Sequence, residues 1–504
     1  MAKRVLFITS DQQRADTLGA YGSPLGATPH LDALAARGAV FTRAHCQHPY
    51  CQPSRWTILT GQHPRTHGVW TNGVDPEPQQ LEDALSTRLS ARGVATSFVG
   101  KAHLASVGVL RPGASPHMEA LGNALRMPDD WTGPYMGFER VQLLQMGHYP
   151  AGYGPAPLGL HYGRFLAEGS RRRAWSRFLQ AGPRRSLSGG MIAPQTWHSA
   201  LPEELHPTTW ITDRAIEEVE RLGDSSWLLW VSYADPHHPF APPAPWCHRY
   251  RPDDMILPER RLEELDDKPP LQRRFARGYL PVDVGLNTAS TATSDRALAT
   301  MMAAYYGMIA QIDHGVGRLL EALAARGLAD DTLIVFTVDH GELMGDHHLL
   351  FKGPFHYEGL LRVPLIVAGD GVPAGARSAE PVGTIDLAPT FERALGAPRG
   401  PRVEGSDLLP VARGEVARDG VVTENDHRVV FREHVLTLTT RHHKLNMHVG
   451  RPYGELYDLD DDPGERVNLW RHRPALRAEL ARRLEELLPP APARARPPAT
   501  WLPA

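Results

Sequence analysis

Residues 332–342 read TLIVFTVDHGE, an apolar run of strand length that ends in an acid, a histidine, a glycine and a second acid. The run is rich in β-branched and aromatic residues and shows no polar alternation, which is typical of a strand buried on both faces. Strands of this kind belong to parallel sheets that helices cover on both sides. The stretch therefore predicts an α/β protein with reactive side chains at the carboxyl end of a strand.

Three further apolar runs end in the same way. The polar groups that follow them are Asp11-Gln12 after 5–10, Lys101-Ala102-His103 after 95–100, and Asp235-Pro236-His237-His238 after 227–234. An aspartate after a strand is ordinarily a turn former, but four coincidences in one chain favour a common site. Because ligands of open parallel sheets bind beyond the carboxyl ends of the strands, we expect the four groups to share one crevice.

Amphipathic stretches separate the apolar runs and predict the covering helices. They span 30–38, 211–223 and 308–327, and each closes on a glycine (Gly38, Gly223 and Gly327) where a left-handed cap is expected. A further apolar run at 363–368 predicts another strand. The predicted fold is a large, mostly parallel central sheet flanked by helices.

The pattern changes near residue 415. Residues 429–450 alternate polar and apolar side chains in short pieces, as antiparallel strands do, and a helical pattern follows. We therefore expect a catalytic domain over 1–415, a small α+β subdomain over 416–488 and a Pro-rich tail over 489–504. Within the catalytic domain, residues 105–200 lack a steady period and are expected to form irregular specificity loops.

Composition excludes several classes of protein. The 504 residues carry a formal net charge of −3, which does not favour nucleic acid or a membrane surface as partner. Every apolar run falls short of the roughly 20 residues of a spanning helix, and the first run is too short for a signal peptide. Three cysteines cannot form a disulfide framework, so we expect a cytoplasmic protein in which Cys46 and Cys247 are small buried residues or idle thiols.

Four of the strand-end residues suit a divalent metal. Asp11, Gln12 and Asp339 offer oxygen donors and His340 offers an imidazole, without a required thiolate. The imidazole shifts the preference from Ca²⁺ toward Mn²⁺, and both ions stay open. Two carboxylates would neutralise the ion, which could then polarise an anionic ester.

Cys51 stands where a helix is expected to begin. The run Cys51-Gln52-Pro53-Ser54-Arg55 precedes WTILTG, and a helix N-terminus with an arginine nearby attracts anions and lowers the pKa of a thiol. A disulfide, a metal thiolate, a nucleophile and a precursor of another group are all open. Beside a metal, a lysine and several histidines, the residues favour phosphoryl or sulfuryl transfer over acyl transfer.

The same motifs resemble those of the type I sulfatases of the alkaline phosphatase superfamily. The matching segments are 11–22, 28–69, 100–104, 235–240, 337–367 and 455–469, which leaves mainly 105–200 and 245–300 unmatched. Cys-x-Pro-Ser-Arg with Leu59-Thr60-Gly61 downstream resembles the signal for oxidation of the cysteine to formylglycine by a formylglycine-generating enzyme. Gln62 departs from the arginine that the family often has at this position.

The resemblance implies a mechanism and a role for each residue. One hydroxyl of the hydrated formylglycine at position 51 would attack sulfur and expel the alcohol, and collapse of the other would release sulfate. The implied roles are metal ligation by Asp11, Gln12, Asp339, His340 and the modified Cys51; orientation of the hydrate by Arg55; binding of sulfate oxygens by Lys101 and Lys352; base catalysis by His103; and proton donation or hydrogen bonding to the leaving oxygen by His237. Asn72 is either a further anion ligand or a turn residue.

Two positions bear on the reaction. Gln12 and His340 resemble the branch that contains choline sulfatases and phosphonate monoester hydrolases, which often uses manganese and also acts on phosphate diesters or phosphonates. Lys101-x-His103 instead matches the sulfatase pattern, so sulfate monoester hydrolysis is the main expectation and the phosphonate or diester activity the alternative. A non-catalytic anion-binding relative would not need the combination of Cys51, Arg55, Lys101, His237 and Lys352.

The expected substrate is a small-molecule or carbohydrate sulfate ester. Six arginines in 170–186 could steer a sulfated polyanion, or could form a solvated loop or a contact in a homo-oligomer. His198, Glu203 and His206 are further candidates for substrate contact.

Overall fold

The central sheet is built around five parallel strands. In spatial order they are β7 (Thr332–Val338), β1 (Arg4–Ser10), β6 (Trp227–Ser232), β4 (Ala95–Lys101) and β5 (Arg140–Leu144). Three short strands extend the sheet beyond β7: antiparallel β9 (Ile366–Ala368), then β2 (Gly38–Phe41) and β10 (Ala376–Ser378). The computed structural model describes residues 3–107, 115–145, 159–173, 192–277, 293–427 and 433–489.

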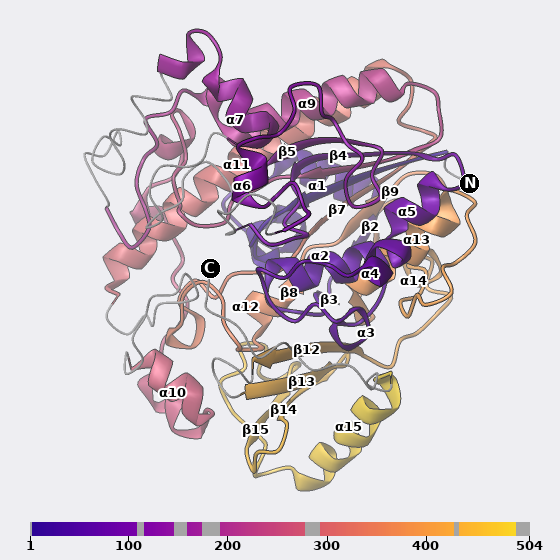
Figure 1. Cartoon of the computed structure of the whole chain (residues 1–504). Helices are drawn as coiled ribbons and strands as arrows, with labels where there is room; N and C mark the ends of the chain where they lie inside the picture. The colour runs from indigo at the N-terminus through magenta and orange to yellow at the C-terminus, as the bar shows by residue number, and fades with distance from the viewer. Residues whose placement is uncertain are drawn as a thin grey trace.

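Helices cover both faces of this sheet, which confirms the predicted α/β class (Figure 1). One layer contains α1 (Pro29–Ala36), α9 (Pro207–Leu222) and α11 (Asp295–Ala325), and the other contains α2 (Cys51–Thr60), α5 (Leu85–Ser90) and α13 (Leu387–Ala394). Every residue of β1 and β7 is buried, as their continuous apolar runs predict. Phe7 and Trp230 of neighbouring strands pack with ring centroids 4.9 Å apart.

Two local predictions were wrong. The run at 363–368 is not one strand: β8 (Arg362–Val363) pairs in a small three-stranded sheet, and β9 begins only at Ile366. Pro364, which has no N–H to donate to a strand partner, lies at the break. Gly38 does not cap α1 either, because Arg37 ends that helix and Gly38 starts β2.

Glycine is required where β4 meets β6. Gly100 has a φ of +114°, and a Cβ atom at this position would lie 1.9 Å from the carbonyl oxygen of Ser232. The next residue, Lys101, ends the strand. The close approach of the two backbones therefore fixes where the lysine leaves the sheet.

A second, antiparallel sheet follows after residue 420. Its strands, in order, are β12 (Val421–His427), β13 (Glu433–Thr439), β14 (His443–His448) and β15 (Gly454–Asp458). Helix α15 (Pro474–Leu487) packs Leu480 and Leu484 onto one face of this sheet. The predicted antiparallel strands and the helix after them are both confirmed, and Figure 1 shows this layer beside the larger sheet.

Buried ion pairs attach the small sheet to the elements around it. Lys444 of β14, which is inaccessible to solvent, lies 3.1 Å from Glu358 and 2.9 Å from Glu465. Glu424 of β12, another strand of this sheet, contacts Arg65 of α3 at 2.7 Å. The small sheet is thus held partly by charges that are desolvated in the folded protein.

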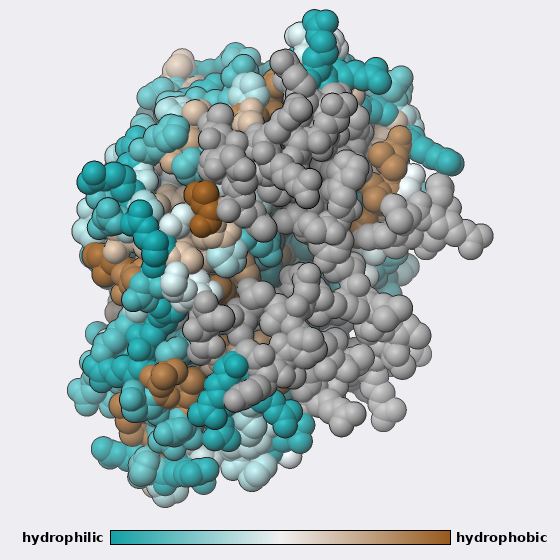
Figure 2. Space-filling model, turned by 90° about the vertical axis from the view of Figure 1, so that its left-hand side faces the viewer, coloured by the Kyte–Doolittle hydropathy of each residue, from teal (hydrophilic) through white to brown (hydrophobic). Residues whose placement is uncertain are grey.

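The remaining described elements are short, apart from the eight-residue α7. They are β3 (Ala44–His45), β11 (Val382–Gly383), α3 (Pro64–His67), α4 (Pro78–Asp83), α6 (Leu121–Ala124), α7 (Leu160–Ala167), α10 (Pro270–Ala276), α12 (Glu358–Leu361) and α14 (Leu409–Ala412). Among the described residues, no helix has the length and apolar character needed to cross a membrane. On the face in Figure 2, the described surface is mainly hydrophilic with small separate apolar patches.

Candidate active site

The four strand-end groups meet at one edge of the sheet. Strands β7, β1, β6 and β4 are neighbours and parallel, so their carboxyl ends lie side by side. Asp11 Oδ2 lies 2.6 Å from Lys101 Nζ, the Asp11 amide donates to the Asp235 carbonyl at 3.1 Å, and the Gln12 amide donates to Asp339 Oδ1 at 3.1 Å. The expected crevice is therefore present, assembled from segments up to 328 residues apart in the printed sequence.

Cys51 is the first residue of α2 and points into this crevice. Its sulfur lies 3.1 Å from Lys352 Nζ, 3.1 Å from His340 Nε2 and 3.8 Å from Asp11 Oδ1. Asn72 supports the same helix end, because its Oδ1 accepts from the Gln52 amide at 3.0 Å. The thiol is 1% exposed, so the buried polar groups around it determine its chemistry.

The surrounding charges lower the pKa of Cys51. Burial alone raises the pKa of this thiol, but the positive charges of Lys352, His340 and Lys101 outweigh it, and the pKa falls well below its ordinary value. A hydrogen bond from His103 acts in the same direction. The position therefore stabilises a negatively charged oxygen or sulfur atom.

Arg55, one turn along α2, ties the two central carboxylates together. Its Nε donates to Asp339 Oδ2 at 3.0 Å, and a terminal nitrogen donates to Asp11 Oδ2 at 3.2 Å. Another nitrogen donates to the Lys101 carbonyl at 2.7 Å. With no solvent exposure, Arg55 connects α2 to the ends of three strands.

The donor atoms fit a divalent cation. Asp11, Cys51, Asp339 and His340 are all buried and each offers a ligand atom within 4.8 Å of the others. His340 Nδ1 lies 2.9 Å from the Gly341 carbonyl, which leaves Nε2 for the centre of the group. Gln12 also directs its Oε1 toward this centre, where it accepts from Lys352 at 3.1 Å.

The pKa shifts of Asp11 and Asp339 reflect how closely the two carboxylates are placed. Burial and the Cys51 thiolate raise the pKa of Asp11, but Lys101, His237 and Arg55 lower it more, so that it stays ionised. Burial and the neighbouring Asp11 carboxylate raise the pKa of Asp339 above its ordinary value. Two buried carboxylates that compete in this way are a setting that a bound cation stabilises.

Lys352 lies between two histidines, His237 and His340, next to the Cys51 sulfur. Lys352 Nζ lies 2.9 Å from His237 Nε2 and 3.3 Å from His340 Nε2. Burial, Lys352 and Lys101 lower the pKa of His237 to about 4, so this imidazole is neutral at pH 7. His103 adopts a φ of +49°, which turns its backbone N–H onto the Glu119 carboxylate at 2.5 Å.

Three supporting residues are given no role by the sequence, although two of them, His238 and Glu342, stand in the strand-end groups. The Glu342 carboxylate accepts from the side-chain amide of Gln12 and the backbone amides of Met344 and Phe351, and His238 Nδ1 lies 3.0 Å from Gln12 Nε2. Glu342 stands in the quoted DHGE stretch, so its position was the available signal. Glu119, which accepts the amides of His103, Leu104 and Ala105, lies in an irregular region without such a signal.

The other candidates for substrate contact have different surroundings. Glu203 accepts from the Trp246 indole at 2.7 Å, and His206 lies 3.7 Å from the Asp235 carboxylate. His198 packs against His248, with ring centroids 5.4 Å apart. Of the arginine-rich stretch 170–186, only the first four residues are described, and the tail from residue 490 also lies outside the described residues.

At its strand ends the covered parallel sheet carries a buried thiol, cationic side chains and a set of candidate metal ligands, an arrangement typical of a metal-assisted hydrolase. Comparison with known families gives the narrower class. The sequence profile of the sulfatase family matches residues 3–126 and 151–397, and the chain belongs to this family. A second profile, for the C-terminal region of N-sulphoglucosamine sulphohydrolase, matches residues 345–489.

Individual relatives agree with this class. An arylsulfatase of Clostridium perfringens is 27% identical over 93% of this chain and 90% of its own length. The multifunctional alkaline phosphatase superfamily protein PehA of Trinickia caryophylli is 30% identical over 85% of this chain and 81% of its own. The solved phosphonate monoester hydrolase of Agrobacterium radiobacter has a TM-score of 0.77 at 26% identity, covering 96% of this chain and 95% of the other.

Proposed function

We propose that this protein hydrolyses sulfate monoesters by means of a hydrated formylglycine made from Cys51. The observation that carries the proposal is the position of the Cys51 side chain. It begins α2 inside a Cys-x-Pro-Ser-Arg signal and points at Lys352, His340 and Asp11. A thiol would remain as its sulfuryl ester after attack, whereas a hydrated aldehyde offers a second hydroxyl for release.

The charge balance of the site suits an anionic ester. Arg55, Lys101 and Lys352 are buried and positive, and they exceed the two carboxylates of Asp11 and Asp339 by one unit. A divalent cation held by Asp11, Gln12, Asp339, His340 and residue 51 would add charge and polarise the ester. The imidazole of His340 favours Mn²⁺ among the hard ions, with Ca²⁺ as the alternative.

The protein's own residues are assigned as follows. Lys101 and Lys352 bind the sulfate oxygens and stabilise the charge that spreads over them during displacement. Arg55 holds Asp11 and Asp339 and thereby orients residue 51. His103 takes the proton when the second hydroxyl collapses, and Asn72 fixes the start of α2 and lies beside the anion.

His237 serves the leaving oxygen. Its neutral Nε2 lies 2.9 Å from the Lys352 ammonium, so the pair forms a short route from a buried proton source to the ester oxygen. Binding of the anionic sulfate near the imidazole would raise its affinity for a proton. We assign to this pair the proton that the departing alcohol requires.

A second activity has specific support. The similarity to the phosphonate monoester hydrolase extends over nearly the whole chain, and the Gln12 and His340 pair resembles that branch. Hydrolysis of phosphonate monoesters or phosphate diesters is therefore the second candidate. The Lys101 ammonium, which contacts Asp11 at 2.6 Å, favours sulfate because Lys101-x-His103 resembles the sulfatase pattern.

The modification is tested by the mass of the tryptic peptide 44–55, which contains both Cys46 and Cys51. Co-expression with a formylglycine-generating enzyme should lower the mass of residue 51 by about 18 Da, while Cys46 stays an alkylatable thiol and serves as the control. Fragment ions assign the change to one of the two positions. Fully active enzyme with an unmodified Cys51 thiol would contradict the proposed nucleophile.

The reaction is tested by parallel assays of one preparation on an aryl sulfate, an aryl phosphonate and an aryl phosphate diester. The proposal requires the largest kcat/KM for the sulfate, and a larger value for the phosphonate would support the second candidate. Chelation followed by addition of Mn²⁺ or Ca²⁺ separates the ions, because only the correct one restores kcat. An enzyme that keeps full activity after complete metal removal would contradict the metal assignment.

A further inference from the structure

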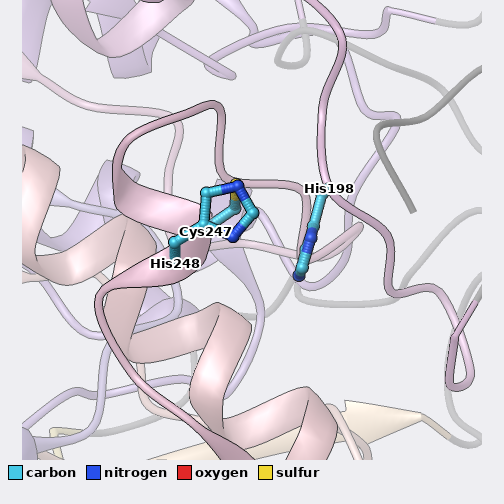
Figure 3. A group of neighbouring side chains, drawn as sticks. All are labelled: His198, Cys247 and His248. Atoms are coloured by element: carbon cyan, nitrogen blue, oxygen red, sulfur yellow. The ribbon is translucent and has the colours of Figure 1, made fainter.

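We propose that His198, Cys247 and His248 form a second metal site, for Zn²⁺ or a similar borderline ion, separate from the active-site ligands. From the sequence alone, Cys247 is expected to be a small buried residue or an idle thiol, and His198 is a candidate for substrate contact. The structure brings the two together with His248, and each residue offers a ligand atom within 4.8 Å of the others. Figure 3 shows the two imidazole rings and the sulfur side by side, from two separate segments of the chain.

The chemistry of the three donors identifies the class of ion. One thiolate and two imidazoles are the ligands that Zn²⁺ prefers, whereas Ca²⁺ and Mg²⁺ need oxygen donors. Three protein ligands leave one tetrahedral position for water. This donor set differs from the oxygen-rich group around Cys51, so the two sites would select different ions from the same solution.

The backbone on both sides of the cluster is already fixed. On one side, the Trp197 amide donates to the Phe240 carbonyl at 3.2 Å and the Ser199 amide donates to the Pro242 carbonyl at 3.0 Å. On the other side, the Cys247 amide donates to the Pro243 carbonyl at 2.9 Å within a short 3₁₀ turn. Little ordering of the chain is therefore needed when the ion binds.

The location gives the site a structural role. The segment around His198 runs beside residues 240–243, which directly follow the stretch 235–239 that carries His237. Glu203 also accepts from the indole of Trp246, the residue before Cys247. An ion bound by His198, Cys247 and His248 would join the 198 segment to this wall of the active-site crevice.

Cobalt titration tests the proposal, because Co²⁺ replaces Zn²⁺ and a cobalt–thiolate bond absorbs in the near ultraviolet. The full-length Cys51→Ala variant is used, so that the active-site group can no longer supply a thiolate. We expect thiolate absorption that saturates at one Co²⁺ per chain and that added Zn²⁺ removes. Cys247→Ser should abolish this absorption, and His198→Gln should weaken Co²⁺ binding by about tenfold or more.

His314→Ala in the same background is the matched control, because His314 is exposed and packs on Trp246 beside the cluster without belonging to it. It should leave the cobalt absorption unchanged. Absence of the absorption at saturating Co²⁺ would overturn the proposal, as would absorption that survives Cys247→Ser. If Cys247→Ser does not fold, the His198→Gln titration decides, and unchanged affinity there counts against the site.

Discussion

The side chain of Cys51 depends on residues from several parts of the chain. Its neighbours Asp11 and His340 were predictable because each stands just after an apolar run, and Lys352 because it lies in the segment 337–367 that resembles the sulfatase family. Glu119 was not predictable, because its carboxylate acts by accepting the backbone amides of residues 103–105 and the hydroxyl of Tyr135. Such a contact exists only once the chain is folded, and no local pattern marks it.

His237 gives a prediction at the residue scale. If His237 and Lys352 supply the proton to the leaving oxygen, His237→Ala should lower kcat by about 10²–10³-fold for an alkyl sulfate, whose leaving group needs that proton. The loss should be less than about tenfold for 4-nitrophenyl sulfate, whose anion leaves unaided. Steady-state kinetics on both substrates measure the difference. An equal loss on the two substrates would show that His237 binds the sulfate instead.

The strands were more predictable than the turns between them. Apolar runs gave β1, β4, β6 and β7 nearly to the residue, because burial on both faces leaves a continuous signature. The prediction of one strand over 363–368 was wrong because it rested on hydropathy alone, and Pro364 interrupts the segment. Helix α11 begins at Asp295, well before the predicted 308, with the Ser294 hydroxyl accepting from the Ala297 amide at 3.2 Å.

Gly100 gives a prediction at the scale of the element. Gly100→Ala should push β4 away from β6, since the new methyl group meets the Ser232 carbonyl, and should displace Lys101 from Asp11. We expect a loss of about 2–4 kcal/mol in the free energy of unfolding and a fall in kcat/KM. Urea denaturation and kinetics test both effects.

Gly93→Ala is the matched control for this change. Gly93 precedes the same strand and has a φ of +77°, but nothing lies within 4 Å of its added Cβ atom. Gly93→Ala should lower the free energy of unfolding only by the backbone strain of about 1 kcal/mol, and it should leave kcat/KM unchanged. Equal destabilisation by the two variants would mean that the contact with Ser232 is not what requires glycine at position 100.

At the scale of the whole molecule, the way the small sheet attaches to the large one could not be predicted. Lys444 stands in an alternating strand whose pattern is typical of an exposed lysine, yet it is buried against Glu358 and Glu465. The lysine and Glu358, which belongs to α12, are 86 residues apart, so their pairing follows from docking of the small sheet against that helix. The two layers themselves were predictable from the change in periodicity near residue 415.

Lys444→Met should therefore destabilise the protein. The change leaves the carboxylates of Glu358 and Glu465 without their shared cation, which costs about 3–5 kcal/mol for a buried pair. Lys3→Met removes a lysine from the exposed pair with Asp331 and should change stability by less than about 0.5 kcal/mol. Urea unfolding of both variants measures the loss in the free energy of unfolding. Similar losses would show that Lys444 contributes no more to stability than a surface charge does.

The pH dependence of stability offers a second prediction at this scale. Burial raises the pKa of Glu264 from 4.5 to about 7, so the folded state binds its proton more tightly than the unfolded state does. The contribution of Glu264 to the free energy of unfolding therefore increases as the pH falls from about 7 toward 4.5. Above about pH 7 the carboxylate is charged in the folded protein, and the full cost of burying that charge is present.

Glu264→Gln should accordingly be more stable than the parent by about 1–2 kcal/mol at pH 8, with the advantage gone near pH 4.5. Thermal unfolding across this range measures the difference. Glu263→Gln, at an exposed neighbouring position, should give parallel curves. A constant difference for Glu264→Gln across the range would contradict the raised pKa.

The depth at which Cys51 is buried has a consequence for when it can be modified. A maturation enzyme that must reach this side chain has to act before the crevice closes, and closure waits for Asp339, His340 and Lys352. On a ribosome, about 300 residues separate the emergence of the cysteine from that of the lysine, which at ordinary elongation rates is about 15–60 s. If Cys51 is converted as proposed, faster translation or premature collapse would leave a correctly folded protein with an unmodified thiol at position 51.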